Sequence, residues 1–380
     1  MKIKANGYSN DADRRINIFL AAPCPPPDGG ITNWQRIVKQ KLIDDEFVHL
    51  KLIDTSLKKE PHKRGLIYSA KGVISILVNA MNTIYGADDL FCRCSAIHIC
   101  TSGGFGFLRD IGLVKIAHSR GIPAMLHLHF GRVPDLLVRE CFESKLLKSV
   151  LKSVDGIMSM DEKTTGALCT YGYGEKTYLV PNPIEDELFG KNSPEKLNEV
   201  VFVGHVLRTK GIEELISAWN LINDKSNDFK LKIIGPVESE YKKYLDSIIV
   251  SNGIELCGPM KHKETLDRIS HARVLVLPSY TEGFPNVVLE AMAVGTFVIA
   301  TPVGSIPEML ANGRGAIVPV KDVDGLANEL LSAIQNEELT SVAVEKAHLF
   351  AQASYSSSSV IEKMKRSWRK MIFNEIGEAV

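Results

Sequence analysis

Two glutamates, Glu282 and Glu290, lie in a segment whose pattern predicts a strand, a loop and a helix in succession. The backbone N–H groups and the positive dipole end of such a helix favour an anion, and a diphosphate fits best. Glu282 would reach the hydroxyls of a sugar, and Glu290 those of a ribose. A capped helix with a solvated Glu290 is the alternative. The loop after Glu282 favours the ligand site and consists of Gly283, Phe284, Pro285 and Asn286.

A second loop, FVGHVLRTKGIEELI, joins a strand that ends at Gly204 to a helix that is expected to begin near Gly211. Arg208 and Lys210 stand just before that helix, so two cations would flank another helix N-terminus. This arrangement suits a leaving diphosphate, because its negative charge grows as the glycosidic bond breaks. An exposed basic turn explains the loop equally well.

Glycines and histidines follow predicted strands in the first half of the chain. Gly29–Gly30 in PPPDGGI and the loop TSGGFG at 101–106 would let the backbone approach a ligand, although glycine pairs also form ordinary turns. In HLHFGR, His127 and His129 share one side of a strand by period two. His129, at the strand end, would bond the transferred sugar. A core histidine is the alternative for His129 and the favoured interpretation for His127.

Short apolar runs separated by helical segments must position these residues. Continuous apolar runs that alternate with helices are typical of parallel sheets covered on both faces. The sequence therefore predicts an α/β protein with two doubly wound Rossmann-like domains that face one another across a cleft. The runs begin near residues 16, 47, 96, 124, 156 and 177 in the first half, and near 200, 231, 254, 274, 296 and 316 in the second.

The stretch 181–199 is rich in proline, asparagine and charge, which makes it the predicted linker. We expect an N-terminal acceptor-side domain at 1–185 and a C-terminal nucleotide-sugar-binding domain at 186–355. Residues 356–380 include the basic amphipathic stretch VIEKMKRSWRKMIF, and this terminal helix is expected to pack back on the first domain.

Composition excludes several classes of protein. The 380 residues carry 45 basic and 45 acidic side chains, so no global field attracts nucleic acid. The seven cysteines contain no C-x-x-C pair, and no run of about 18 apolar residues occurs, which predicts a cytoplasmic enzyme. The segment 136–154 has basic residues among apolar ones and would contact an anionic membrane at its inner face. Packing of its apolar stripe on the sheet is the favoured alternative.

These residues resemble the retaining family 4 glycosyltransferases, whose fold pairs two Rossmann-like domains. The most specific match is the Glu282–Glu290 pair with the EGFPN loop, the EAMAVG helix and the VIATPVGSIPE run. FVGHVLRTKG, VPNPIE at 180–185, HLHFGR and PPPDGGI support it. The chain looks most like bacterial transferases of capsule, O-antigen or related surface-polysaccharide synthesis.

The resemblance implies catalytic roles for Glu282 at the transferred sugar, Lys210 and Arg208 on the diphosphate, and His129 near the sugar ring. The resemblance assigns the other matching residues to binding of the nucleotide-sugar donor. Many members have arginine where this chain has His205, so the second phosphate cation is His205 or Arg208. Many members also have an acidic residue where this chain has Arg132, so the first-domain contacts depart from the family pattern. The implied donor-binding residues are Gly29, Gly30, Asn182, Gly204, His205, Gly283, Phe284, Pro285, Asn286 and Glu290.

The family's reaction implies retention, with the leaving phosphate oxygen taking the acceptor proton. Cations and backbone donors account for every diphosphate contact, so we expect no metal and no cofactor. The expected partners are a nucleotide-sugar donor, with UDP favoured over GDP-mannose, and a glycan or lipid-linked acceptor. An epimerase or phosphorylase on the same fold, and a non-catalytic nucleotide-sugar-binding module, are the alternatives. Donor turnover without acceptor distinguishes the first, and absence of turnover the second.

Overall fold

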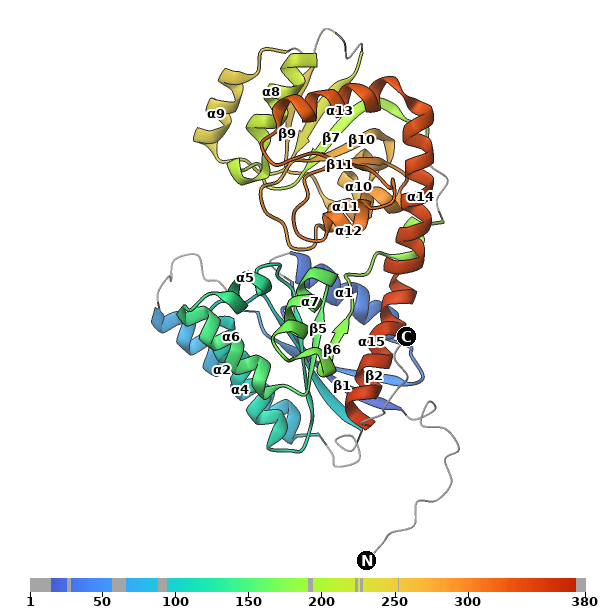
Figure 1. Ribbon diagram of the computed structural model, residues 1–380. Coiled ribbons are helices and arrows are strands. Elements are labelled where there is room, and N and C mark those ends of the chain that lie inside the picture. Colours follow the sequence, from blue (N-terminus) through green and yellow to red (C-terminus); the bar gives the residue numbers. More distant parts are fainter. Residues whose placement is uncertain are drawn as a thin grey trace, which may run out of the picture. The chain divides into compact units, whose positions relative to one another are not determined.

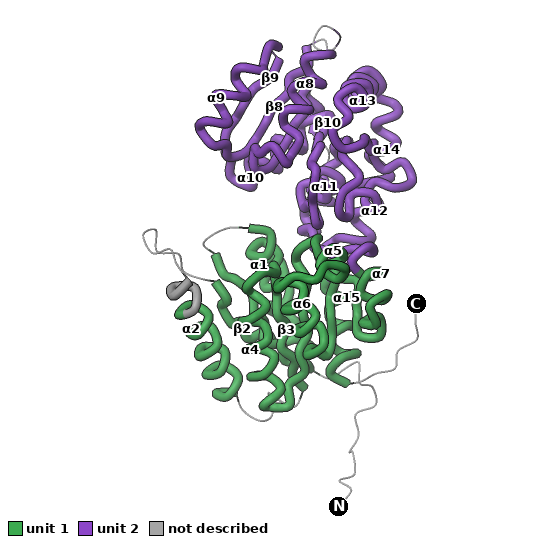
Figure 2. The backbone as a smooth tube through the Cα atoms, turned by 60° about the vertical axis from the view of Figure 1, so that its left-hand side comes forward, with its two compact units in different colours: residues 1–159, 165–180, 361–380 green, residues 160–164, 181–360 purple. Residues whose placement is uncertain are grey.

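The computed structural model describes residues 15–25, 29–56, 66–87, 94–190, 194–222, 225, 228–251 and 253–373. In the helix that begins at Leu66, side chains are described from residue 71 onward. These residues form two compact units (Figure 2). Unit 1 contains the chain up to Ser159, Thr165–Val180 and the segment from Ile361 onward; unit 2 contains Met160–Thr164 and Pro181–Val360. The units separate between Val180 and Pro181, five residues before the predicted boundary.

Unit 1 is built on a six-stranded, wholly parallel sheet of order β2-β1-β3-β4-β5-β6 (Figure 1). Alternate residues of its strands face opposite helical layers. Ile97 and Ile99 pack in the apolar cluster with α4, whereas His98 faces α1 and α15. The strands are β1 (Ile16–Ala22), β2 (Val48–Asp54), β3 (Ser95–Thr101), β4 (Ala124–Leu128), β5 (Gly156–Ser159) and β6 (Thr177–Leu179).

The helices of this half cover both faces of the sheet, and α2, α4 and α6 lie side by side (Figure 1). The helices are α1 (Gly30–Leu42), α2 (Leu66–Tyr85), α4 (Gly106–His118), α5 (Val133–Val138), α6 (Phe142–Ser153), α7 (Glu162–Thr170) and the short η2 (Gly174–Lys176). The predicted amphipathic segment 136–154 is thus two helices. Six of its eight apolar residues are buried, so most of the stripe packs in the core of unit 1.

Unit 2 repeats the plan with a second parallel sheet of order β12-β11-β10-β7-β8-β9. All twelve predicted strands and the doubly wound α/β fold are confirmed. The strands are β7 (Leu197–Val203), β8 (Lys230–Ile234), β9 (Ile254–Gly258), β10 (Ala272–Leu277), β11 (Phe297–Ala300) and β12 (Ala316–Ile317). The helices are η3 (Asp186–Leu188), η4 (Arg208–Lys210), α8 (Ile212–Ile222), α9 (Ser239–Ile248), α10 (His262–His271), α11 (Asn286–Ala293), α12 (Ile306–Leu310), α13 (Val323–Gln335) and α14 (Glu337–Tyr355).

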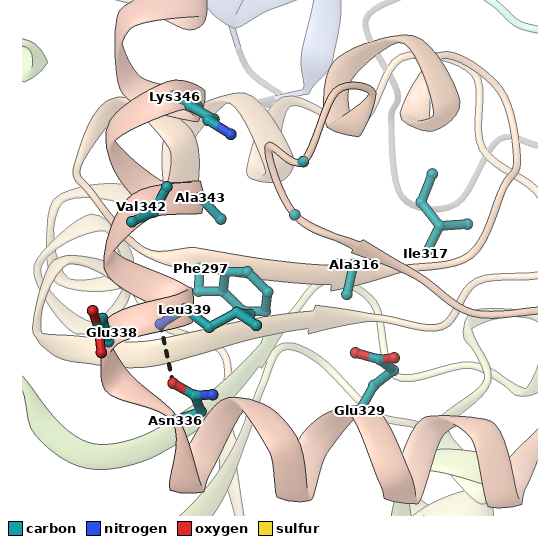
Figure 3. Close-up of a pocket in the computed structure, with 12 residues that line it drawn as sticks. Phe297, Ala316, Ile317, Glu329, Asn336, Glu338, Leu339, Val342, Ala343 and Lys346 are labelled. Carbon is teal, nitrogen blue, oxygen red and sulfur yellow. Dashed lines mark hydrogen bonds between the residues drawn. The ribbon is translucent and has the colours of Figure 1, made fainter.

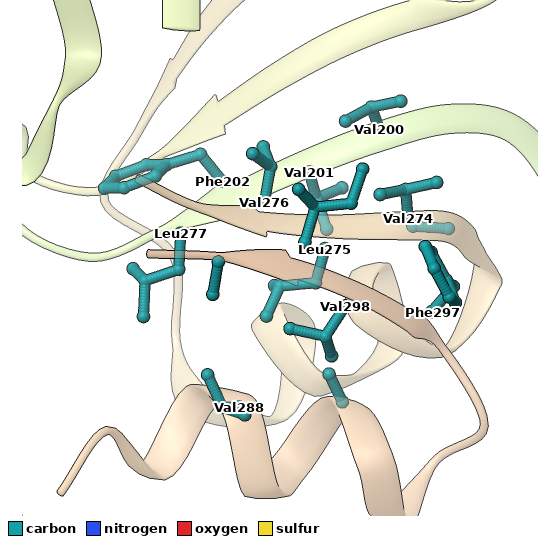
Figure 4. Close-up of a cluster of buried hydrophobic side chains, with 14 of the residues drawn as sticks. Val200, Val201, Phe202, Val274, Leu275, Val276, Leu277, Val288, Phe297 and Val298 are labelled. Atoms are coloured by element: carbon teal, nitrogen blue, oxygen red, sulfur yellow. The ribbon is translucent and has the colours of Figure 1, made fainter. Parts of the chain in front are cut away.

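The centre of the second sheet forms the core that anchors the site loops (Figure 4). Valine and leucine side chains of β7, β10 and β11 are fully or almost fully buried, and Val288 of α11 packs against them. Removing such side chains from water contributes about 1.5–3 kcal/mol each. The carboxyl ends of these strands therefore hold the first residues of the following loops in fixed positions.

The last helix, α15 (Ser357–Phe373), begins in unit 2, and its residues from Ile361 onward belong to unit 1. Trp368 is wholly buried, and Met371 lies close to Gly156 of β5. Lys365 forms ion pairs with Asp45 and Glu362, so the helix is fixed by both packing and charge.

Candidate functional site

The loops after β7 and β10 bring Lys210 and Glu282 together. Lys210 Nζ donates to Glu282 Oε1 at 2.6 Å, and Ser279 Oγ donates to the same oxygen at 2.6 Å. The side chains are only 25% and 12% exposed, respectively. Two residues that are 72 positions apart in the chain thus form one cation–carboxylate pair at the carboxyl edge of the sheet.

Two glycines clamp the backbone beside this pair. Gly211 has a φ of +69°, and a Cβ there would lie 2.1 Å from the Pro278 carbonyl oxygen. Gly304 has a φ of +58°, and its Cβ would lie 2.3 Å from the Gly283 oxygen. Ser305 N also donates to Gly283 O at 3.0 Å. Because both positions exclude a side chain, the loops are held before any ligand arrives.

Helix α11 begins at Asn286 directly after this loop, and no side chain caps its first N–H groups. Asn286 Oδ1 accepts from Asn182 Nδ2 at 2.9 Å, which ties the helix start to the segment that follows β6. The Phe284 ring packs edge-on against Tyr355 at 6.0 Å. The uncapped helix N-terminus beside Lys210 can therefore receive an anion.

Glu290 lies one turn into α11 and is buried, with 8% of its surface exposed. Its Oε1 is 2.9 Å from His262 Nε2 at the start of α10. The alternative of a solvated Glu290 is therefore wrong, since the carboxylate faces α10 and not solvent. Sequence reasoning missed His262, because a histidine in the run MKHKET carries no signal of a partner 28 residues away.

Arg208 is directed toward α9. Its guanidinium lies 5.3 Å and 4.9 Å from the ring centres of Tyr241 and Tyr244, and its Nη1 pairs with Glu213 at 2.8 Å. Within the described residues no contact between Arg208 and the Lys210–Glu282 pair is seen. The structure thus brings together Lys210 and Glu282 and leaves Arg208 on a separate cluster.

The neighbouring Gly204 and His205 have different explanations. A Cβ at Gly235 would lie 1.8 Å from the Gly204 oxygen, so the ends of β7 and β8 are pressed together here. Gly204 itself has a φ of +152°, which glycine adopts readily. His205 is exposed beside them. A backbone requirement therefore accounts for Gly204, and no packing contact accounts for His205.

In unit 1, Gly29 precedes α1 and Gly30 is its first residue. Gly29 has an extended φ of −170°, and a Cβ at Gly30 would meet no atom within 4 Å. Thr32 Oγ1 bonds to both the N–H and the carbonyl of Gly29. Neither backbone conformation nor crowding within the described residues requires glycine at position 30.

The TSGGFG loop is, by contrast, a structural turn. Gly103 and Gly104 have φ angles of +85° and +66°, and Gly104 N donates to Glu143 at 3.0 Å. Arg132 Nη2 pairs with the same carboxylate at 3.0 Å. The arginine in place of the acidic residue of many relatives thus has a structural partner.

His129 follows β4 at the carboxyl edge of the first sheet. Its ring is half-buried, and its Nε2 atom is shielded from solvent without a hydrogen-bond partner within the described chain. Burial lowers the pKa of His129 to about 3, so the ring is neutral at pH 7. His127 beside it is wholly buried, as its place inside the strand requires. A neutral imidazole can share a hydrogen bond with a sugar hydroxyl and does not carry charge.

Two kinds of residue group in this chain have the side chains that metal ions prefer, namely Asp-x-Asp triplets and one buried histidine–cysteine group. Two Asp-x-Asp triplets occur: residues 11–13 lie outside the described chain, and in the other Asp322 Oδ1 accepts from Gly325 N at 2.9 Å as the cap of α13. In the described part of unit 1, the ligand atoms of His98, Cys100 and His127 lie within 4.8 Å of one another, but all three residues are buried.

A cavity of about 690 Å³ in unit 2 is lined by Phe297, Ala316, Leu339 and Lys346, among others (Figure 3). Phe297 and Ala316 are the first residues of β11 and β12, so the cavity lies at the amino edge of the sheet. The candidate residues follow the carboxyl ends of the strands. The cavity is therefore separate from the candidate site.

Comparison with known families gives a match in the second half of the chain. Residues 183–350 match the family model described as glycosyl transferases group 1. A glycosyltransferase of Methanocaldococcus jannaschii is 26% identical over 94% of this chain and 96% of its own length. A capsular polysaccharide biosynthesis glycosyltransferase of Staphylococcus aureus is 28% identical over 54% of each chain.

Solved structures share the fold. The sucrose-phosphate synthase of Thermosynechococcus elongatus has a TM-score of 0.73 and 19% identity, with 95% of this chain and all of that chain covered. The Anabaena protein HepE, solved with UDP and glucose, has a TM-score of 0.68 and 16% identity over 93% of this chain and 99% of its own. These likenesses establish the two-domain fold. In the described residues no helix is both long and apolar enough to cross a membrane.

Proposed function

We propose, from the match of residues 183–350 to the glycosyl transferases group 1 family, that this chain moves a sugar from a nucleoside diphosphate to an acceptor with retention at the anomeric carbon. The observation that carries the proposal is the Lys210–Glu282 pair beside the uncapped start of α11. A sugar nucleotide has a diphosphate and a sugar as neighbours, and this pair offers a cation and a carboxylate as neighbours.

In this proposal Lys210 and the N–H groups of α11 bind the donor diphosphate. Glu282 accepts from hydroxyls of the transferred sugar, and Glu290 from the ribose. His129 and the Gly29–Gly30 turn contribute from unit 1. The gap left at Gly30 and the unpartnered Nε2 of His129 support these last assignments.

The proposed reaction exchanges one bond for another on the same face of the sugar. The bond from the anomeric carbon to the phosphate oxygen breaks, and a bond to the acceptor oxygen forms. The acceptor proton passes to the departing phosphate oxygen, so no protein base is required. Lys210 and the helix N–H groups stabilise the charge that grows on the diphosphate, a contribution of about 3 kcal/mol per donor in comparable sites. Metal independence is part of the proposal.

For the donor we favour a UDP-sugar, with GDP-mannose as the other candidate. The likeness to a protein solved with UDP and glucose supports this choice. For the pathway we propose bacterial surface-polysaccharide synthesis, since relatives include capsule and colanic acid glycosyltransferases. The acceptor would be a glycan or a lipid-linked sugar.

A lipid-linked acceptor would bring the protein to an anionic membrane, and helix α2 is the better candidate for that contact than 136–154. Ile74, Val78, Met81 and Tyr85 are 44–60% exposed, and their spacing of four, three and four residues puts them on one stripe. Residues 66–85 contain no acidic side chain and one exposed cation, Lys71. An apolar stripe with basic flanks is typical of interfacial helices.

Sedimentation with anionic vesicles at low salt tests this contact. Ile74→Asp with Val78→Asp should abolish co-sedimentation, whereas Leu221→Asp, a change of an exposed apolar residue on α8, should leave it unchanged. Failure of the unmodified protein to co-sediment would remove the membrane from the proposal.

The transferase proposal itself is tested by a screen of UDP- and GDP-sugars for nucleotide release, with and without glycan and lipid-linked acceptors. We expect release that depends on an acceptor, and a product whose anomeric configuration matches that of the donor. Release without acceptor would favour the epimerase or phosphorylase alternative. Binding without any release would favour a non-catalytic module, and an inverted product would contradict the proposed reaction.

A further inference from the structure

A buried hydrogen bond joins α15 to the first sheet. Trp368 Nε1 lies 3.0 Å from His98 Nδ1, and both side chains are wholly buried. An indole nitrogen can only donate, so His98 Nδ1 must accept. Its ring therefore carries no proton on Nδ1.

The tautomer of His98 in turn determines which nitrogen of His127 carries its proton. Burial lowers the pKa of His98 to about 3, so the ring is neutral and its single proton is on Nε2. His98 Nε2 lies 3.3 Å from His127 Nδ1, which must then be the acceptor. His127 is also neutral, because burial lowers its pKa well below the usual range, and its proton is consequently on Nε2.

His129 packs directly on this chain of bonds. The ring centres of His127 and His129 are 4.0 Å apart. Trp34 of α1 completes the cluster, since its ring is stacked on His98 at 5.4 Å and edge-on to His129 at 5.0 Å. Trp34 and His127 thus contact the His129 ring directly, and Trp368 is linked to it through His98 and His127.

We propose that Trp368 is a positioning residue, which fixes the tautomers of His98 and His127 and thereby holds His129 in the orientation that its sugar contact needs. The role of His129 in a sugar contact rests on the proposed function, whereas the tautomer assignment does not. Both nitrogens of His98 and Nδ1 of His127 already face hydrogen-bond partners.

Nitrogen-15 NMR of protein labelled at histidine tests the assignment in the unmodified enzyme, without donor. At pH 7 both His98 and His127 should give the signature of a ring protonated at Nε2 alone. A proton on His98 Nδ1 would overturn the proposal, as would a shift of these signals on addition of zinc. Since no variant is needed, this measurement stands even if a replacement prevents folding.

Trp368→Phe keeps a ring but removes the N–H donor, so His98 should become a mixture of tautomers and kcat should fall about fivefold to tenfold, the value of one neutral hydrogen bond. The KM for the donor should change less than twofold. Trp34→Phe is the matched control for the NMR signature, because Trp34 Nε1 has no partner in the described chain. Unchanged signals in Trp368→Phe would contradict the proposal. Loss of all nucleotide release in the unmodified protein would instead sink the proposed function and leave the tautomers standing.

Discussion

The two sheets carry their candidate residues in different ways. In unit 2, Lys210 and Glu282 bond to each other, and Gly211 and Gly304 clamp the loops that bear them. In unit 1, Gly30 faces open space and His129 keeps an unpartnered Nε2. Under the proposed function, unit 2 would be a preorganised site for the diphosphate and the sugar, whereas the unit 1 residues would complete their hydrogen bonding only with a ligand. Changes at the unit 2 glycines should therefore lower stability, whereas a change at Gly30 should lower activity without any loss of stability.

The largest effect is expected at the Lys210–Glu282 pair. Lys210→Ala and Glu282→Ala should each lower turnover by about a hundredfold or more, since one preorganised charge contributes about 3 kcal/mol to the transition state. Lys232→Ala is the matched control, because Lys232 pairs with Glu255 on the same sheet, away from the candidate loops. Near-normal turnover in a folded Lys210 or Glu282 variant would remove that residue from the mechanism.

The glycines separate the two regions most clearly. Gly211→Ala should lower the free energy of unfolding by about 3 kcal/mol, because a side chain at positive φ is strained and its Cβ would overlap the Pro278 carbonyl. Gly30→Ala should raise it by about 0.4–1 kcal/mol while nucleotide release falls. Denaturant unfolding and the release assay measure both. A Gly30→Ala enzyme with full activity would contradict a ligand contact at this position.

Glu290 should contribute to stability as well as to donor binding. Glu290→Ala removes the carboxylate that lies 2.9 Å from His262 Nε2 and is expected to cost about 1–2 kcal/mol in the unliganded protein. Glu345→Ala, a change of an exposed glutamate on α14, should cost far less. Thermal melts with and without UDP compare the variants. If Glu290→Ala binds UDP like the unmodified protein, the carboxylate has only a structural role.

The histidine cluster should make the protein sensitive to acid. His98 keeps a folded pKa of about 3, whereas an unfolded histidine titrates near 6.5, so below pH 6.5 the unfolded state binds the extra proton. Stability is therefore full above pH 6.5 and falls by about 1.4 kcal/mol per pH unit for this residue as the pH drops toward 3. Urea unfolding from pH 7.5 to 5 should show a shallower loss in His98→Gln than in the parent. Equal slopes in His98→Gln and the parent would contradict the assignment.

The sequence predicted the fold well because each buried parallel strand is a continuous apolar run that its local pattern reveals. It singled out Lys210 and Glu282 separately, since both follow strand ends on one edge, but it did not predict that they bond to each other. It did not reveal side-chain partners on other elements. The partner of Glu290 is on α10, that of Arg208 on α9, and that of His98 on α15, 270 residues away. Such contacts depend on how helices pack on the sheet, which local periodicity does not encode.

The most direct test of the central claim is calorimetric titration of UDP and GDP into the unmodified protein and Lys210→Ala, each with chelator and with added magnesium. The account predicts that the unmodified protein binds a nucleoside diphosphate equally well in both buffers and that Lys210→Ala loses at least tenfold in affinity. At a hundred times the dissociation constant, the ligand should also stabilise the unmodified protein by about 2.7 kcal/mol. Binding that appears only with magnesium, or an affinity that survives Lys210→Ala unchanged, would contradict a diphosphate site built from Lys210 and the start of α11.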